Sequence, residues 1–143
     1  IQDTFVTTDR YLENLRIREG NEKGTILNNA TFMMLDKDNI SRKYVDMYLS
    51  SNQISMSNII EINTMDLLIE LARIDLGIAC VIKDFVMDDL AQGTLKELSF
   101  RRTIPKRKIG LVYKDDTIMS DAMKKFISYF MDQTGNESLI SSI

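Results

Sequence analysis

The most informative pattern of hydrophobic and polar positions lies between Met65 and Ile82. Apolar residues at helical spacing form one face of an amphipathic helix that runs to Leu76. The predicted face consists of Leu67, Leu68, Leu71 and Ile74. Gly77 follows as the residue type that most easily adopts the left-handed conformation at a helix end. Residues 78–82 are a continuous apolar run, which fits a strand covered on both faces. Such a joint is typical of layered α/β domains that bind small molecules at strand ends.

Other short segments are rich in β-branched residues or alternate between apolar and polar positions, and they predict the remaining strands. These segments are residues 3–8, 31–35, 58–63, 95–100 and 108–113. The order of strands and helices predicts an α/β sandwich with a mixed, mostly parallel sheet flanked by helices.

The intervening segments predict helices of different lengths. Residues 9–14 form a single turn, and residues 16–29, with two glycines, are mostly loop. The pattern predicts further helices over 41–51, over 83–92 with Gly93 as the stop, and in the last part of the chain. Thr64 is the predicted N-cap of the helix that follows it, and Ser120 that of the last helix. The last helix carries an apolar stripe, ends at Gly135 and leaves residues 136–143 as a frayed tail. The stripe is formed by Met123, Phe126, Ile127, Phe130 and Met131.

Composition restricts the function classes. The chain has 143 residues, of which 44% are apolar, enough for one domain with its own core. A net charge of −3 argues against direct contact with nucleic acid. No apolar run reaches the roughly 18 residues of a membrane span, and no secretion leader is evident, so we expect a cytoplasmic protein. The chain starts at Ile1 without an initiator methionine, which favours a fragment or a processed product.

The chemistry of the side chains favours binding over catalysis. The chain has no histidine, which removes Ser-His-Asp and Cys-His catalysis and the commonest metal ligand. The single cysteine, Cys80, lies in an apolar strand, where we expect a buried and inert thiol. The carboxylates Asp84, Asp88 and Asp89 have no partner base and no metal-ligand spacing. We therefore expect no enzyme, no cofactor and no metal site.

Several short motifs, in this order and at this spacing, resemble the C-terminal part of LysR-type transcriptional regulators over nearly the whole chain. The motifs are Asn39-Ile40-Ser41-Arg42, Thr64-Met65-Asp66-Leu67-Leu68, Leu76-Gly77-Ile78-Ala79 with Val81, Gly93-Thr94-Leu95, Ile104-Pro105 with Arg107-Lys108-Ile109-Gly110-Leu111-Val112, and Ser120-Asp121-Ala122 with Phe126-Ile127.

The resemblance implies a domain of two α/β subdomains, like a type 2 periplasmic binding protein, joined by two crossing strands with the effector between them. Residues 1–143 would then be a partial effector-binding domain. The first crossing strand lies around residues 4–6, and residues 7–106 form the second subdomain. Residues 108–132 supply the return crossing strand and a C-terminal helix of the first subdomain. The opening half of that subdomain, the winged helix-turn-helix and the linker helix would lie outside this chain.

The resemblance also implies effector-binding positions. Polar groups at the start of the helix after the second strand would face the cleft, and here these are Ser41 and Arg42. A helix N-terminus suits an anionic ligand, Ser41 could donate its hydroxyl, and Arg42 could hold a carboxylate with two hydrogen bonds. The alternative is that Ser41 only caps the helix and that Arg42 is solvated.

Four further residues are candidates at strand ends. Thr64 could contact the ligand or serve only as an N-cap. Ile82 and Lys83 leave a strand at the cleft rim, where a lysine indicates a charged effector or an ion pair that closes the cleft. A solvated Lys83 is the alternative. Thr7 could line the hinge or be an ordinary strand residue.

The resemblance and these residues together imply the ligand-sensing domain of a LysR-type regulator that binds a small, anionic metabolite to control transcription. DNA would be contacted only through the N-terminal domain, and the intact protein would be a homo-oligomer, a dimer or a tetramer, with no membrane partner. The alternative is a solute-binding-protein-like domain of a transport or sensing system. We interpret the basic cluster around Pro105 as a solvated rim or a subunit contact. The cluster consists of Arg101, Arg102, Lys106, Arg107 and Lys108.

Overall fold

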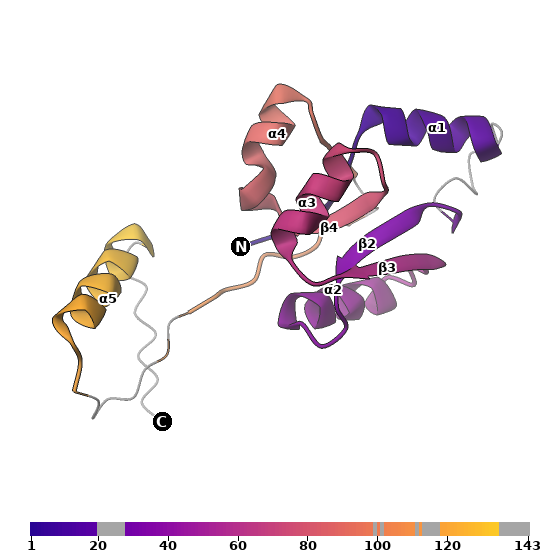
Figure 1. The fold of residues 1–143 in the computed structure, drawn as a ribbon. Coiled ribbons are helices and arrows are strands. Elements are labelled where there is room, and N and C mark those ends of the chain that lie inside the picture. Colours follow the sequence, from indigo (N-terminus) through magenta and orange to yellow (C-terminus); the bar gives the residue numbers. More distant parts are fainter. Residues whose placement is uncertain (20–27, 99, 101, 111, 113–117, 135–143) are drawn as a thin grey trace. The chain divides into compact units, whose positions relative to one another are not determined.

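The computed structural model describes residues 1–19, 28–98, 100, 102–110, 112 and 118–134. The chain divides into two units, Ile1–Lys108 and Ile109–Ile143. The first unit contains a five-stranded sheet with the order β3-β2-β4-β1-β5 (Figure 1). Its strands are β1 (Asp3–Thr7), β2 (Thr31–Leu35), β3 (Asn58–Ile62), β4 (Ile78–Ile82) and β5 (Lys96–Leu98). β2 pairs in parallel with β3 and β4, whereas β1 is antiparallel to β4 and β5. The predicted mixed α/β fold is confirmed, with β1 as the strand of opposite direction.

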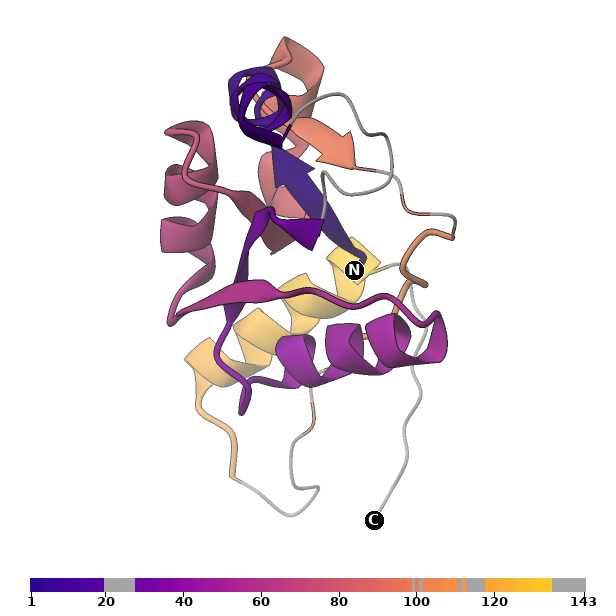
Figure 2. The ribbon, with the colours of Figure 1, turned by 90° about the vertical axis from the view of Figure 1, so that its right-hand side faces the viewer.

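Helices cover both faces of this sheet. They are α1 (Asp9–Glu19), α2 (Ile40–Ser51), α3 (Met65–Arg73), the 3-10 turn η2 (Lys83–Val86) and α4 (Met87–Gln92). α3 lies in front of the sheet in Figure 1 and to its left in Figure 2, whereas α2 lies on the other side. The second unit contributes α5 (Asp121–Thr134).

Alternate residues along the strands build two core layers, as the two-residue period of a strand requires. One layer joins α1 and α2 to the sheet and contains Phe5, Phe32, Met34 and Cys80 among others. The opposite layer joins α3, η2 and α4 to the sheet and contains Val6, Met33, Ala79 and Val81 among others. Burial raises the pKa of the Cys80 thiol, which confirms the predicted buried cysteine.

The helix after β1 is longer than the sequence pattern predicted. We predicted one turn over 9–14 and loop from 16 onward, but α1 continues to Glu19. Tyr11 and Leu15, four residues apart, are both buried against the sheet, and this packing stabilises a second turn. The Thr8 hydroxyl accepts a hydrogen bond from the Tyr11 amide and caps the start of the helix. Residues 20–27 of the predicted loop lie outside the described residues.

The buried face of α3 also differs from the prediction. Leu68, Ile69 and Ala72 are the buried residues of this helix, whereas Leu67 is 47% exposed and Ile74 is 64% exposed. The helix ends at Arg73 rather than at Leu76. Apolar residues occupy so many neighbouring positions here that periodicity fits two faces, and packing on the sheet selects the one centred on Leu68.

Gly77 is required for a different reason from the one the sequence suggested. The left-handed conformation after α3 is adopted by Asp75, with φ of 64°, and not by Gly77. The Asp75 carboxylate accepts hydrogen bonds from the Thr8 hydroxyl and from Arg10, and these contacts lower its pKa. A Cβ at Gly77 would lie 2.6 Å from the Thr31 carbonyl oxygen, so close approach of two backbones excludes a side chain there. Gly93, with φ of 74°, ends α4 as predicted.

The predicted strand over 108–113 is not present in its described part. Residues 108–110 and 112 form no strand, and residues 111 and 113 lie outside the described residues. An isolated strand has no hydrogen-bond ladder to stabilise it, and residues 108–110 and 112 pair with none of the five strands of the sheet. β5 is likewise shorter than the predicted 95–100 segment. Ser120 accepts a hydrogen bond from the Met123 amide at 3.3 Å, as the predicted cap should. The predicted stop at Gly135 and the tail over 136–143 lie outside the described residues.

An ion pair between an exposed arginine and a buried aspartate joins α3 to α4. Arg73 donates to both carboxylate oxygens of Asp89, at 2.9 and 2.7 Å, and Asp89 is 8% exposed. The hydrogen bond from Arg73 and its charge hold the pKa of Asp89 below its usual value of about 3.9. Because the folded pKa is lowered, the pair stabilises the fold above pH of about 3.9, and this stabilisation is lost as pH falls through the folded pKa.

We expect Asp89→Asn to lower the free energy of unfolding by about 1 kcal/mol near pH 7, because Arg73 loses the more buried of its two acidic partners and keeps only Glu70. Urea denaturation of both proteins at a series of pH values measures this. The difference should shrink at acid pH, where the wild-type carboxylate is itself protonated. Asp88→Asn, which changes an exposed carboxylate next to it, is the matched control and should have almost no effect. An equal loss in both variants would contradict the assigned role of the pair.

Candidate functional site

One edge of the sheet gathers most of the polar residues that the sequence analysis singled out. β2, β3 and β4 run in the same direction, so their carboxyl ends meet at this edge, and the antiparallel β1 begins there with Asp3. The chain leaves β2 for the start of α2 and leaves β3 for the start of α3. In α/β sheets with parallel strands, ligands bind outside the carboxyl ends of the strands.

Ser41 is not the cap of α2. The helix begins at Ile40, and its N-cap is Asn39, whose side-chain oxygen accepts from the Ser41 amide at 2.8 Å. The Ser41 hydroxyl therefore has another role, and it accepts a hydrogen bond from Nη2 of Arg107 at 2.6 Å. A hydroxyl that accepts in this way still has its own hydrogen to donate.

Arg42 is buried rather than solvated, and other groups of the chain already hold its guanidinium. Nε donates to both carboxylate oxygens of Asp46, at 2.9 and 3.0 Å, and Nη1 donates to the Leu35 carbonyl oxygen at 2.9 Å. The Glu61 carboxylate lies 3.6 Å from Nη1. Arg42 thus joins the end of β2, the first turns of α2 and β3, and its charge is balanced within the protein.

Arg107 lies beside Ser41, although the sequence analysis placed it only in a basic surface cluster. Its side chain is 14% exposed and forms two hydrogen bonds with the Asp3 carboxylate, at 2.8 and 3.1 Å. Asp3 is 2% exposed, so this pair is shielded from water. The guanidinium also lies over the Tyr44 ring, 5.4 Å from its centroid. The Asp3 carboxylate raises the pKa of Arg107 and fixes its positive charge.

Three of these residues, Asp3, Ser41 and Arg42, line a small hollow at this edge of the sheet. Its lining combines the polar side chains of Asp3, Ser41 and Arg42 with apolar ones. The apolar part consists of Met34, Leu35, Val45, Met65 and Cys80. Such a mixture, mostly apolar with a few convergent polar groups, is typical of sites for small molecules.

Lys83 and Thr64 lie at the same edge but have their own partners. Lys83 donates to Glu97 at 2.7 Å, and Glu97 also accepts from the Thr4 hydroxyl at 2.7 Å. These two contacts lower the pKa of Glu97. Thr64 caps α3 through its hydroxyl, which accepts from the Leu67 amide at 3.4 Å. Ile82 is the residue that pairs with Asp3 across β1 and β4.

Thr7 is not brought to this site. It lies at the other end of β1, is fully buried, and donates its hydroxyl to the Gly77 carbonyl oxygen at 3.0 Å. Since β1 runs antiparallel to β4, its last residue lies at the edge opposite to Asp3.

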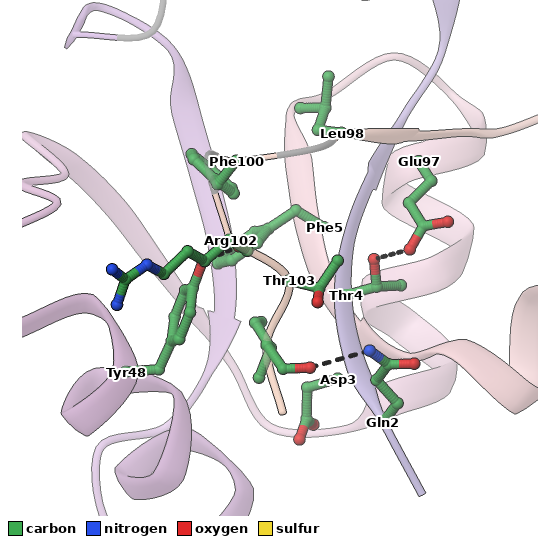
Figure 3. A pocket seen from close by; sticks show the side chains of 11 residues that line it. Gln2, Asp3, Thr4, Phe5, Tyr48, Glu97, Leu98, Phe100, Arg102 and Thr103 are labelled. Atoms are coloured by element: carbon green, nitrogen blue, oxygen red, sulfur yellow. Dashed lines mark hydrogen bonds between the residues drawn. The ribbon is translucent and has the colours of Figure 1, made fainter. Parts of the chain in front are cut away.

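A second hollow lies between β1, β5 and residues 102–104 (Figure 3). Gln2 donates to the Ile104 carbonyl oxygen at 2.8 Å, and the Tyr48 hydroxyl donates to the Arg102 carbonyl oxygen. Burial raises the pKa of Tyr48. The polar groups of this hollow are thus used to fix the 102–104 segment against β1 and α2.

The chemistry of the edge suits binding of an oxyanion. It offers a guanidinium, a serine hydroxyl and the positive end of the α2 helix dipole, which suit carboxylate or phosphate oxygens. Among the described residues, no group of three or more histidine, cysteine or acidic side chains lies close enough to hold a metal ion.

Comparisons with known proteins identify the family. The family model described as "LysR substrate binding domain" matches residues 23–135. A search of curated protein sequences found no significant match. Among solved structures, the regulatory domain of CcmR from Synechocystis PCC6803, in complex with 2-PG, has a TM-score of 0.63 at 16% identity. That match covers 95% of this chain and 64% of the other chain.

Two further structures are similar. The regulatory domain of a HypT mutant from Salmonella typhimurium has a TM-score of 0.60 at 13% identity, covering 94% of this chain and 64% of the other. The C-terminal domains of a LysR family protein from Agrobacterium tumefaciens have a TM-score of 0.53 at 12% identity, covering 68% and 45%. The chain therefore spans between 45% and 64% of the length of these structures. Because the family model matches most of its residues, the chain belongs to the LysR substrate binding domain family.

Proposed function

We propose that this chain is the ligand-sensing part of a LysR-type transcriptional regulator, and that it binds a small anionic metabolite at the carboxyl edge of its sheet. The observation that carries the proposal is the convergence of Asp3, Ser41 and Arg42 on a hollow with an otherwise apolar lining, together with Arg107, which is hydrogen-bonded to both Asp3 and Ser41. The family match supports a sensing role, and the similar CcmR domain was solved with 2-phosphoglycolate (2-PG), which carries a phosphate and a carboxylate.

The organisation that we propose follows the two units. Residues 7–106 form a second subdomain, and residues 108–132 return to a first subdomain, whose remaining part completes the cleft. In this proposal the hollow is one wall of the ligand site. Ser41 and Arg107 contact the ligand in this proposal, Arg42 positions the start of α2, and Thr64, Ile82 and Lys83 form the rim.

The remaining parts of the proposal concern the intact regulator. DNA is contacted by another domain, the protein is cytoplasmic, and effector binding shifts the arrangement of a homo-oligomer on DNA. The exposed apolar residues of α5, among them Phe126 and Tyr129, support a contact between subunits. No helix in the described part of the chain has the length and apolar content needed to cross a membrane.

An NMR titration of the isotopically labelled chain with 2-PG tests the site. We expect shifts of amide signals in residues 36–42 and 63–65, and none around Thr7 at the opposite edge. Ser41→Ala should weaken binding about tenfold, because the ligand loses a hydrogen bond to a charged group. Ser50→Ala, at the exposed far end of the same helix, is the matched control and should bind normally. Shifts confined to the opposite edge, or equal binding by both variants, would contradict the proposed site.

A further inference from the structure

The guanidinium of Arg107 is held in one orientation by three different groups. Nε and Nη2 donate to the two oxygens of Asp3, Nη2 also donates to Ser41, and the flat face lies over Tyr44. The backbone of Arg107 is fixed too, because its amide and carbonyl exchange hydrogen bonds of 3.0 Å with the backbone of Ile1. A donor group that is fixed in this way loses little side-chain freedom when it binds a ligand.

One part of this guanidinium is left for an incoming group. Within the described residues, Nη1 of Arg107 takes part in none of the hydrogen bonds that hold the side chain. The Ser41 hydroxyl accepts from Nη2, so its own hydrogen is available next to the same guanidinium. Nη1 and Ser41 together can bind two oxygens of one carboxylate or phosphate group.

Asp3 carries a carboxylate, which is the kind of group that Nη1 of Arg107 and the Ser41 hydroxyl would bind in a ligand. Its carboxylate accepts two hydrogen bonds from Arg107, and only 2% of the Asp3 residue is exposed to solvent. A bound carboxylate neutralises most of the guanidinium charge, which weakens the attraction of any second anion. Asp3 therefore acts against the ligand at the same cation that attracts it.

From these contacts we infer that Arg107 is the residue that recognises the anion at this site, and that Asp3 competes with the ligand for Arg107. The site therefore takes small molecules with one compact carboxylate or phosphate. This inference rests on the proposed function and adds the recognising residue and the ligand group. It makes a prediction of opposite sign for the two members of one ion pair: loss of Arg107 weakens anion binding, and neutralisation of Asp3 strengthens it. A pair with a structural role only would give no gain in either variant.

The test uses the whole chain and inorganic phosphate as the probe, with binding measured by NMR titration and folding by urea denaturation. Arg107→Met should weaken phosphate binding at least about tenfold, as expected for loss of a charged hydrogen-bond donor. Lys106→Met removes an equal charge from the exposed neighbouring residue and should change affinity less than about twofold. Asp3→Asn should tighten phosphate binding several-fold.

Arg107→Met leaves the buried Asp3 carboxylate without its partner and therefore risks unfolding. The double variant Asp3→Asn with Arg107→Met avoids this, and it should fold and bind phosphate as weakly as the single arginine variant. Arg107→Lys keeps the charge without the planar fork and should give an intermediate affinity.

Four outcomes overturn the inference. Asp3→Asn could bind phosphate no better than wild type, or the double variant could bind as well as Asp3→Asn. If phosphate shifts the amides of residues 36–42 in Arg107→Met with the wild-type affinity, the site remains and only the role of Arg107 fails. If neither phosphate nor 2-PG shifts these amides in the wild-type chain, the proposed function at this edge fails together with the inference.

Discussion

Gly77→Ala is expected to lower the free energy of unfolding by about 3 kcal/mol, the upper part of the range for overpacking. The new Cβ would lie 2.6 Å from the Thr31 carbonyl oxygen, a distance that real Cβ contacts do not reach. Neither backbone can withdraw easily, because Thr31 begins β2, and Gly77 precedes β4 and accepts a hydrogen bond from the Thr7 hydroxyl. The two strands would have to separate at the centre of the sheet.

Two other glycines provide controls for this prediction. The Cβ added by Gly93→Ala has no neighbour within 4 Å, but residue 93 keeps its positive φ of 74°. We therefore expect backbone strain to lower the free energy of unfolding by about 1 kcal/mol. Gly110→Ala meets open space without positive φ and should be neutral. Urea denaturation of the three variants separates crowding from strain. A loss at Gly77 no larger than that at Gly93 would show that the two strands can move apart without cost.

Phe5→Ala is expected to destabilise the chain by about 4 kcal/mol, within the range for removal of a buried aromatic ring. Phe5 is 1% exposed and forms edge-to-face contacts with Phe32, at 6.1 Å between ring centroids, and with Phe100, at 5.1 Å. It lies on β1, so its ring joins the sheet to the segment after β5. The cavity left by alanine cannot be filled by the Phe32 ring, which is fixed on β2.

Thermal and urea unfolding of this variant should be compared with Phe85→Ala, which removes the same ring from a position that is 59% exposed. The control should change stability by no more than about 0.5 kcal/mol. If both variants lose the same stability, ring burial does not explain the effect, and the assigned core layer would need revision.

The local pattern of the chain was sufficient for most elements but not for the face of α3. Residues 78–82 form a strand as the apolar run predicted. In α3, however, Leu67 and Ile74 are exposed while Ile69 and Ala72 are buried, because two overlapping apolar faces were available and only tertiary packing distinguishes them. The predicted strand over 108–113 failed in its described part for a related reason, since strand propensity without a pairing partner does not produce a strand.

The positions of site residues that follow the end of a strand could be predicted from the sequence. The positions that depend on the direction of a strand, or on a partner far away in the sequence, could not. Ser41 and Arg42 follow β2, and the structure places them at the edge where the parallel strands end. Thr7 was expected near them, but β1 runs the opposite way and carries it to the other edge. Arg107 was missed because its partner, Asp3, is 104 residues away in sequence. The available signal was an acidic residue at the start of a predicted core strand, because a buried carboxylate needs a cationic partner.

The reciprocal backbone hydrogen bonds between Ile1 and Arg107 have a mechanical consequence. Residues at the two ends of the Ile1–Lys108 unit are thereby joined directly to each other. Asp3 and Arg107 belong to these two ends and are paired with each other, so a ligand that contacts Arg107 would act on the point where the ends of the unit are held together.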